Sequence, residues 1–508
     1  MSQYEILPLD LLHSPLLSLL KGLPLLAFAF LLARCIKRRY FSKLYSIPGP
    51  FTASITRAWR VREVYNGHVE KTEIELHKKY GPLVRTGPNE VITNDPKALE
   101  VFYGIGSKFP KAYFYRAFAQ PDVWGINAFS ALDNATHSRL ARYISAAFSM
   151  TSIVELELYV DNSLAYFIGK LEEFAKSGVH VNMSQWFQWY AFDVVGELTL
   201  STRFGFMEKG VDIDGTTKVI DFFNGYATFV GQAFPYHWLL LGNPLVRMFL
   251  KAPAGVLIEV SKFTAAEVKA RQGRPTNRRD MLSRFLKAHE KHPAEFPMDD
   301  VLRTCSMTLT AGSDTTGIAL SATLYHVLKN PKVYAKLKDE IDQAIDNRKV
   351  STPSKFREIQ ELPYLQAVLK EAMRFHPSVA DILPRVVSEG GCTIAGRFLP
   401  PGTRVGVNPY VLHRDKDIFG DDADDFRPER WLERDEKLMQ RYMLQFGQGS
   451  RICVGRHISI LELNKTLVEV IRNFNIELTD PNYEMTSTNR WFLKPHTLPC
   501  VFKRRVLS

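Results

Sequence analysis

The chain has 508 residues, of which 45% are hydrophobic and 23% are charged, so it has enough apolar material for a large core. Its five cysteines are scattered and odd in number, which argues against a disulfide framework and favours a reducing compartment. The net charge is +11, but no basic stretch carries the interleaved aromatic residues that nucleic-acid binding favours. We therefore expect no nucleic-acid partner. The basic clusters are interpreted as solvated faces or as contacts with membrane headgroups or an acidic partner.

The N-terminus carries an apolar run over residues 11–36, followed directly by Lys37, Arg38 and Arg39. About 20 apolar residues suffice to span a bilayer, and positive charge marks the cytosolic side. No basic residue precedes the run, so an uncleaved signal anchor is favoured over a cleaved signal peptide. The sequence predicts a single N-terminal transmembrane helix and hinge in residues 1–44, which would contact membrane lipid, and one large domain in residues 45–508.

The rest of the chain shows mainly helical periodicity with short strand-like pieces at 82–94 and 397–413, which predicts a mainly α fold with a small β portion. Aromatic residues gather in 109–129 and 222–236. Such clusters are more often core than pocket. The apolar segment 238–250 suits either a helix that dips into a membrane surface or a buried helix.

The stretch FGQGSRICVG at 446–455 places Cys453 in a glycine-rich loop just before a segment of helical periodicity. The dipole and free amides of a helix N-terminus stabilise a thiolate. Glycines let the backbone approach a flat ligand closely, and Arg451 supplies a cation for a carboxylate. An electron-rich thiolate of this kind suits axial ligation of haem iron. The alternative is a buried or redox cysteine in a glycine-rich turn.

This loop is similar to the haem-ligand signature of the cytochrome P-450 monooxygenases, through Phe446, Gly449, Arg451, Cys453 and Gly455. The resemblance extends over essentially the whole chain. It implies the cytochrome P-450 fold, a haem b cofactor (iron protoporphyrin IX) and Cys453 as the axial ligand of the iron. It also implies that Arg451 and Arg385, in the segment ILPRVV, bind haem propionates.

Residues 299–330 predict one long helix, with acids at its start and Asn330-Pro331 at its end. Its centre, from Ala311 to Thr316, carries small and hydroxyl side chains, so we expect a local opening of the helix there. The segment resembles the acid–alcohol motif of the family. By that resemblance Ala311 and Gly312 leave room for O₂, and Asp314 and Thr315 relay protons. A packed crossing of small residues or a helix N-cap is the alternative.

Glu371 and Arg374 lie three apart on a helix expected to begin at Pro363 and to end before Pro377. By resemblance, Arg430 in DDFRPERW joins them in a structural triad that holds the loop beneath the haem. The early helix departs from the family pattern Trp-x-x-x-Arg, because His137 and Ala141 occupy those positions. His137 and Arg142 are therefore the candidates for a propionate contact on that helix.

The resemblance implies a membrane-bound, haem-thiolate monooxygenase that inserts one oxygen atom from O₂ into a lipophilic small molecule. In overall character, the sequence resembles fungal microsomal members of the family that modify secondary metabolites. This implies an endoplasmic reticulum location with a cytosolic catalytic domain. Electrons would come from NADPH-cytochrome P-450 reductase, with cytochrome b5 as a second candidate donor. Two alternatives stay open: an O₂-independent isomerase or dehydratase on the same scaffold, and a non-enzymatic haem sensor or carrier.

Overall fold

Most of the chain is helical, and the strands form four small sheets. The computed structural model describes residues 15–119, 125–233, 235–240, 243–249, 254–273 and 278–505. In the first half of the chain lie α1 (Pro15–Tyr40), α2 (Phe51–Ile55), α3 (Ala58–Asn66), α4 (Val69–Tyr80), β1 (Leu83–Gly87), β2 (Glu90–Thr93), α5 (Ala98–Tyr103), η2 (Tyr113–Phe118), α6 (Asn134–Ile144), η4 (Ser145–Phe148), α7 (Met150–Val154), α8 (Glu157–Ser177), β3 (Val181–Asn182), α9 (Met183–Leu200), α10 (Phe206–Lys209), η5 (Ile213–Gly215), α11 (Thr216–Gln232), α12 (Pro235–Leu239) and α13 (Pro244–Phe249).

The second half supplies the longest helix and most of the strands. It contains α14 (Ala254–Gln272), α15 (Met281–Lys291), α16 (Met298–Lys329), α17 (Pro331–Asp346), α18 (Phe356–Ile359), α19 (Pro363–Phe375), β4 (Arg385–Val386), β5 (Cys392–Ile394), β6 (Arg397–Leu399), β7 (Arg404–Gly406), α20 (Pro409–Leu412), α21 (Lys416–Phe419), α22 (Arg430–Glu433), α23 (Glu436–Tyr442), η6 (Gly449–Arg451), α24 (Arg456–Asn473), β8 (Phe474–Leu478), β9 (Ser487–Arg490), β10 (Phe492–Pro495) and β11 (Pro499–Arg504).

The predicted mainly α fold with a small β portion is confirmed. One sheet has the order β1-β2-β7-β4, and a second has the order β3-β11-β8. The pairs β9–β10 and β5–β6 form the other two. The strand-like segment 82–94 forms the antiparallel pair β1 and β2. The segment 397–413 forms β6 and β7 but then turns into α20, because Asn408 caps the Tyr410 amide at 2.9 Å and Pro409 fits the first helical turn.

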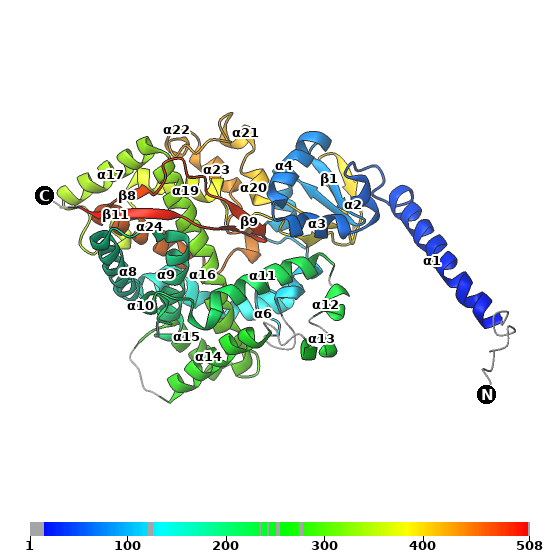
Figure 1. The fold of residues 1–508 in the computed structure, drawn as a ribbon, viewed down its shortest axis with the longest axis horizontal. Coiled ribbons are helices and arrows are strands. Elements are labelled where there is room, and N and C mark those ends of the chain that lie inside the picture. The colour runs from blue at the N-terminus through cyan, green and yellow to red at the C-terminus, as the bar shows by residue number, and fades with distance from the viewer. Residues whose placement is uncertain are drawn as a thin grey trace, which may run out of the picture.

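The long helix α16 runs through the centre of the body, with α9 as its most extensive neighbour (Figure 1). It also packs against α19, which carries Glu371 and Arg374, and against α24, which follows the Cys453 loop. The largest apolar core cluster draws on these helices together with α8. The body is therefore built around one helix, and the segments on its flanks define the site.

The first helix, α1, extends away from the body at the end that carries the small β1–β2 sheet (Figure 1). From Leu23 to Ile36 its described apolar side chains are mostly exposed. Across the described residues, no helix combines the length and apolar character that a membrane crossing requires. The predicted transmembrane helix is thus not confirmed. Residues 1–14 of the predicted anchor lie outside the described part.

Candidate functional site

A cavity of about 320 Å³ lies between the centre of α16 and the loop that carries Cys453. Its floor is formed by the loop and the start of α24, and its opposite wall by α16. The two motif regions lie more than a hundred residues apart in the chain, and the fold brings them to one space. The cavity lining includes most of the predicted site residues: Cys453, Arg451, Arg385, Phe446, Gly455, Ala311, Gly312, Thr315 and His137.

The Cys453 loop is held in shape by its backbone. The Cys453 amide donates to the Phe446 carbonyl oxygen at 2.7 Å, and α24 begins three residues after the cysteine. Gly449 has a φ of +63°, and a Cβ there would lie 2.0 Å from the Tyr103 carbonyl oxygen. Only glycine fits this approach. Gly449 therefore positions the loop against α5, while Cys453 is accessible from the cavity.

The local electrostatics of Cys453 are only partly as predicted. Burial raises the pKa of the Cys453 thiol, whereas the Gly455 and Arg456 amides and the Arg456 charge lower that pKa. The amides at the start of α24 thus lower the pKa of Cys453, as predicted, but the rise caused by burial is larger. A bound metal ion is the further positive charge that would favour the thiolate.

Facing the cysteine, Ala311 is exposed to the cavity and Thr315 lies one turn further along α16. The Thr315 hydroxyl donates to the Ala311 carbonyl oxygen at 2.9 Å. The expected opening of the helix is absent, because α16 is continuous from Met298 to Lys329. The side-chain hydrogen bond of Thr315 is made in addition to the backbone hydrogen bonds of the helix and does not replace any of them. Room beside the helix comes from the small side chains.

Asp314 does not line this cavity. Its buried carboxylate accepts hydrogen bonds from the Gln188 amide on α9 and, at 3.0 Å, from Asn224 on α11. The Lys494 ammonium on β10 lies 3.8 Å away. Burial raises the pKa of Asp314 to about 6, and Lys494 limits that rise. Of the predicted relay pair, only Thr315 is at the cavity surface.

Three cations reach the cavity without a carboxylate partner: Lys111, Arg385 and Arg451. None of them forms an ion pair within the described ranges. Lys111 was not predicted. Its Nζ donates to the Phe129 carbonyl oxygen at 2.5 Å, and burial beside Arg385 and Arg451 lowers its pKa well below the usual value. Uncompensated buried charge is costly, so this corner is built for an anion.

The early helix α6 contributes one of its two candidates. His137 lines the cavity, where burial and the neighbouring cations lower its pKa to about 4. Arg142 is exposed and does not line it. Five residues along a helix correspond to about 140° of rotation, so both side chains cannot face the same space. Arg139, the other arginine of this helix, does not line the cavity either and forms an ion pair with Asp300 at 2.9 Å.

Comparison with known proteins identifies this arrangement. The sequence model of the family described as cytochrome P-450 matches residues 48–499. The chain belongs to the cytochrome P-450 family. It is 39% identical over 473 residues to cytochrome P-450 monooxygenase cicH of Emericella nidulans, covering 89% of this chain and 92% of that protein. Pisatin demethylase of Fusarium vanettenii is 34% identical over 495 residues, covering 96% and 94%. Cytochrome P-450 monooxygenase gsfF of Penicillium aethiopicum is 34% identical over 486 residues, covering 92% and 95%.

This P-450 is accordingly a haem-dependent monooxygenase, and its cavity fits haem. Cys453 is accessible on one side and exposed Ala311 lies on the other. A Cβ added to Gly455 would meet no atom within 4 Å, so the loop leaves open space there. The cations Lys111, Arg385 and Arg451 match the two carboxylates that haem carries.

The outer wall of the P-450 cavity is aromatic. Phe118, Phe129 and Phe223 come from the two aromatic-rich segments and line it, whereas exposed Phe222 does not. Residues 120–124 and 234 of those segments lie outside the described part. Trp491 and Phe492, at the β9–β10 turn, were not predicted; the Trp491 and Phe114 ring centroids are 4.8 Å apart. Val379 and Leu383, in the segment just before β4, also line it.

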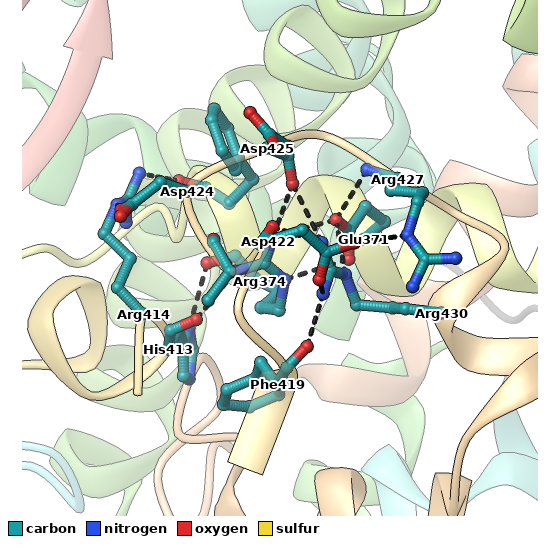
Figure 2. Close-up of polar contacts among 12 residues, drawn as sticks. Glu371, Arg374, His413, Arg414, Phe419, Asp422, Asp424, Asp425, Arg427 and Arg430 are labelled. Atoms are coloured by element: carbon teal, nitrogen blue, oxygen red, sulfur yellow. Dashed lines mark hydrogen bonds and ion pairs between the residues drawn. The ribbon is translucent and has the colours of Figure 1, made fainter. Parts of the chain in front are cut away.

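The predicted triad is present and buried (Figure 2). Glu371 accepts from Arg374 at 2.8 and 2.9 Å and from the Arg430 Nε at 3.0 Å. His413, which was not predicted, links the triad to the cysteine loop. Burial and Arg374 lower the His413 pKa to about 3, so the ring is neutral. Its Nε2 accepts from the Leu444 amide at 2.8 Å, and Nδ1 donates to the Arg374 carbonyl at 3.1 Å.

Proposed function

We propose that this P-450 inserts one oxygen atom from O₂ into a lipophilic, aromatic small molecule, as a tailoring step in fungal secondary metabolism. The observation that carries the proposal is the single cavity that joins accessible Cys453 to Thr315 and is walled by Phe118, Phe223 and Trp491. Aromatic walls favour flat, apolar ligands, because ring–ring contacts add to area burial. The relatives that carry monooxygenase names come from fungi.

In this proposal the Cys453 thiolate would hold the haem iron, and haem would supply the activation of O₂. Arg385, Arg451 and His137 hold the propionates, with Lys111 as a fourth group on the same side. Two of the Arg451 nitrogens already donate to backbone carbonyls at 131–133, which fixes the direction of its guanidinium. Phe446, Gly449 and Gly455 shape the loop under the ring.

Thr315 and Asp314 have different tasks in the proton supply. The Thr315 hydroxyl hydrogen is engaged with Ala311, so its oxygen is free to accept a hydrogen bond and hold a water in the cavity. Asp314 lies behind it, and Asn224, which lines the cavity, donates a hydrogen bond to its carboxylate. We assign Asp314 as the source of protons and Thr315 as the residue that positions their last carrier.

Electrons come from a separate chain in this proposal, namely NADPH-cytochrome P-450 reductase, with cytochrome b5 as an additional donor. No Rossmann or flavin motif is present in the sequence. The isomerase or dehydratase alternative would turn over without NADPH. The sensor or carrier alternative would bind haem and consume no NADPH.

We further propose that residues 1–44 attach the P-450 domain of residues 45–508 to the endoplasmic reticulum membrane. Support comes from the exposed apolar side chains of α1 and from the basic last turn at Lys37–Arg39. Exposed Trp238, Leu245 and Met248 on α12 and α13 offer a second apolar contact with lipid. Retention in the membrane pellet after an alkaline wash, lost on removal of residues 1–44, checks this.

The proposal is tested with reductase, NADPH and ¹⁸O₂ on a panel of lipophilic aromatics, including methylated ones because one relative is named a demethylase. We expect one labelled oxygen per product, or per formaldehyde released on demethylation. Thr315→Ala should lower product per NADPH by about 10²-fold or less and raise peroxide release, because the positioned water is lost. Turnover without NADPH would instead support the isomerase.

The matched control is Thr323→Ala. Thr323 lies two turns further on α16 and bonds back to Ala319 at 2.7 Å, as Thr315 does to Ala311, but it does not line the cavity. Its loss should leave product per NADPH unchanged. Equal uncoupling in both variants would remove Thr315 from the proton supply.

Lys111 gives a separate prediction about cofactor retention. A hydrogen bond to a charged group contributes about 1.5–3 kcal/mol, so Lys111→Met should speed haem transfer to apomyoglobin about tenfold or more. Lys111→Arg should restore much of the loss. The control is Lys108→Met, since Lys108 is exposed and does not line the cavity. Haem loss from Lys111→Met at the wild-type rate would contradict a propionate role.

A further inference from the structure

A polar side chain, Asn224, lies on the apolar inward face of α11. Ile220, Phe223 and Asn224 line the cavity between α16 and the cysteine loop, and Ala227 is buried one turn further on. Spacings of three and four residues place these positions on one side of a helix, and the side that faces a core or pocket is normally apolar. Phe222, on another side of the same helix, is 48% exposed. Asn224 is therefore a polar group within an apolar, aromatic wall.

The direction of the Asn224 amide is set by a group outside the cavity. Its Nδ2 donates to the buried Asp314 carboxylate at 3.0 Å. A carboxylate only accepts hydrogen bonds, so the amide nitrogen faces Asp314 and the amide oxygen is directed away from it. No described residue donates to that oxygen. Because Asp314 does not line the cavity and Asn224 does, the oxygen is the polar end that Asn224 presents to the cavity.

The same hydrogen bond makes the Asn224 oxygen a stronger acceptor. An N–H group that donates to an anion increases the negative charge on the oxygen of its own amide, because linked hydrogen bonds polarise one another. Burial raises the pKa of Asp314 to about 6, so its carboxyl group is ionised at about pH 8 and keeps this effect. A strong acceptor in an apolar wall fixes the orientation of a ligand that brings a donor.

Hydroxyl groups elsewhere on the cavity wall have already used their hydrogens. Thr308 and Ser378 line the cavity and donate to the carbonyl oxygens of Thr304 and Thr315, at 2.7 and 2.8 Å. The Thr315 hydroxyl likewise donates to the Ala311 carbonyl oxygen. A hydroxyl whose hydrogen is engaged can still accept. This part of the wall therefore offers acceptors, and the ligand must supply the hydrogen.

The charge and shape of the cavity select among possible donors. Among the described residues, no aspartate or glutamate lines it. An ammonium group would be buried there without a protein carboxylate as its partner, which is unfavourable. A neutral hydroxyl avoids this cost, and a phenol is more acidic than an aliphatic alcohol and so donates more strongly. The ring of a phenol also suits the walls that Phe118, Phe223 and Trp491 form.

We propose that the Asn224 amide oxygen accepts a hydrogen bond from a phenolic hydroxyl of the substrate, so that this P-450 selects phenols among lipophilic aromatic molecules. Asn224 then determines specificity and moves no proton. The inference rests on the proposed monooxygenase function for the aromatic substrate, whereas the hydrogen bond can be measured without turnover. The alternative is that Asn224 only holds Asp314 in place, as the Gln188 amide does from α9.

The test is the binding of matched ligands to the ferric, haem-loaded protein at about pH 8, without reductase or NADPH. The panel pairs a naphthol with its methyl ether and a hydroxybiphenyl with its methyl ether, because each ether keeps the rings and lacks the donor. Dissociation constants are measured by equilibrium dialysis. A neutral hydrogen bond of ordinary strength should make the wild type bind each phenol about twofold to tenfold more tightly than its ether.

Asn224→Leu removes the amide and keeps the approximate size of the side chain. It should lose the preference for the phenol, so the ratio of the two dissociation constants should change by about twofold to tenfold, with the ether bound at least as tightly as by the wild type. Gln188→Met is the matched control, since Gln188 also donates to Asp314 but does not line the cavity. This variant should keep the wild-type ratio.

An unchanged ratio in Asn224→Leu would overturn the proposal, as would a wild type that binds no phenol of the panel. Equal loss of preference in Gln188→Met would show that both amides act only by holding Asp314. If Asn224→Leu does not take up haem, the structure of the wild type with the bound naphthol decides: its hydroxyl oxygen should lie about 2.5–3.0 Å from the Asn224 Oδ1, and a hydroxyl directed elsewhere would reject the contact. A phenol preference without any NADPH-dependent product would count against the proposed function alone.

Discussion

Cys453→Ala should abolish the strongly red-shifted Soret band of the reduced, CO-bound protein and all NADPH-dependent product formation. The reason is that no other described cysteine reaches the cavity: Cys305 and Cys500 are buried elsewhere, Cys392 lies on β5, and Cys35 lies on α1. The measurement is the CO difference spectrum of membranes that contain the full chain. Cys453→His should move any remaining band to the shorter wavelength typical of histidine ligation.

Cys392→Ser is the matched control for this experiment. Cys392 is half-buried at the start of β5 and does not line the cavity, so its loss should leave the spectrum unchanged. A Cys453→Ala protein that retained the wild-type spectrum and activity would refute the ligand assignment. A wild-type protein without any band would mean that the cavity does not take up haem.

The parts of the fold that the sequence predicts well are those with local signals. The long helix was expected at 299–330 and lies at Met298–Lys329, because Asn330 and Pro331 mark its end. The helix that carries Glu371 begins at Pro363, as expected. The cysteine loop was predicted from ten residues, and the helix after it from the apolar periodicity of the segment that follows. Each of these depends on residues within a few positions of one another.

The features that were missed depend on how elements are rotated and on contacts between distant segments. Asp314 and Thr315 are neighbours in sequence, but a helix turns about 100° per residue, and only packing against α9 and α11 decides which of them faces the cavity. Rotation about the helix axis likewise explains why His137 lines the cavity and Arg142, on the same helix, does not. Lys111 lies in a loop and Trp491 at the turn between two strands. Neither position belongs to a periodic pattern of apolar residues, so the sequence gives no indication that these side chains are buried beside the site.

The Glu371 pair shows the same limit in terms of energy. From their i, i+3 spacing alone, Glu371 and Arg374 would be a surface ion pair that contributes about 0–1 kcal/mol to the stability of the fold. In the structure both side chains are 0% exposed, because the segment with Arg430 folds over them. The Arg427 amide also donates to Glu371, at 2.9 Å (Figure 2). The Trp431 indole donates to the same carboxylate at 3.0 Å. A pair that looks weak in sequence thus becomes the centre of a buried network.

Glu371→Ala should therefore be the most destabilising single change away from the cysteine. Removing one partner of a buried ion pair costs about 3–5 kcal/mol, because the other charges stay buried without compensation. Here Arg374 and Arg430 would both lose their only shared carboxylate in the described structure. A loss of that size is a large share of the stability of a folded domain, roughly 5–15 kcal/mol. We expect little haem-loaded protein on expression.

Glu371→Gln keeps the shape and part of the hydrogen bonding, so it provides a variant that can be purified and measured. Its denaturant midpoint, followed by circular dichroism and by the haem band, should fall well below that of the wild type. Glu433→Gln is the control: Glu433 also pairs with an arginine, Arg427 at 2.5 Å, but is 58% exposed, so its loss should cost about 0–1 kcal/mol. Because His413 joins Arg374 to Leu444, haem loss in Glu371→Gln should precede loss of helix. Equal midpoints for the two variants would show that burial of the triad contributes nothing to the support of the cysteine loop.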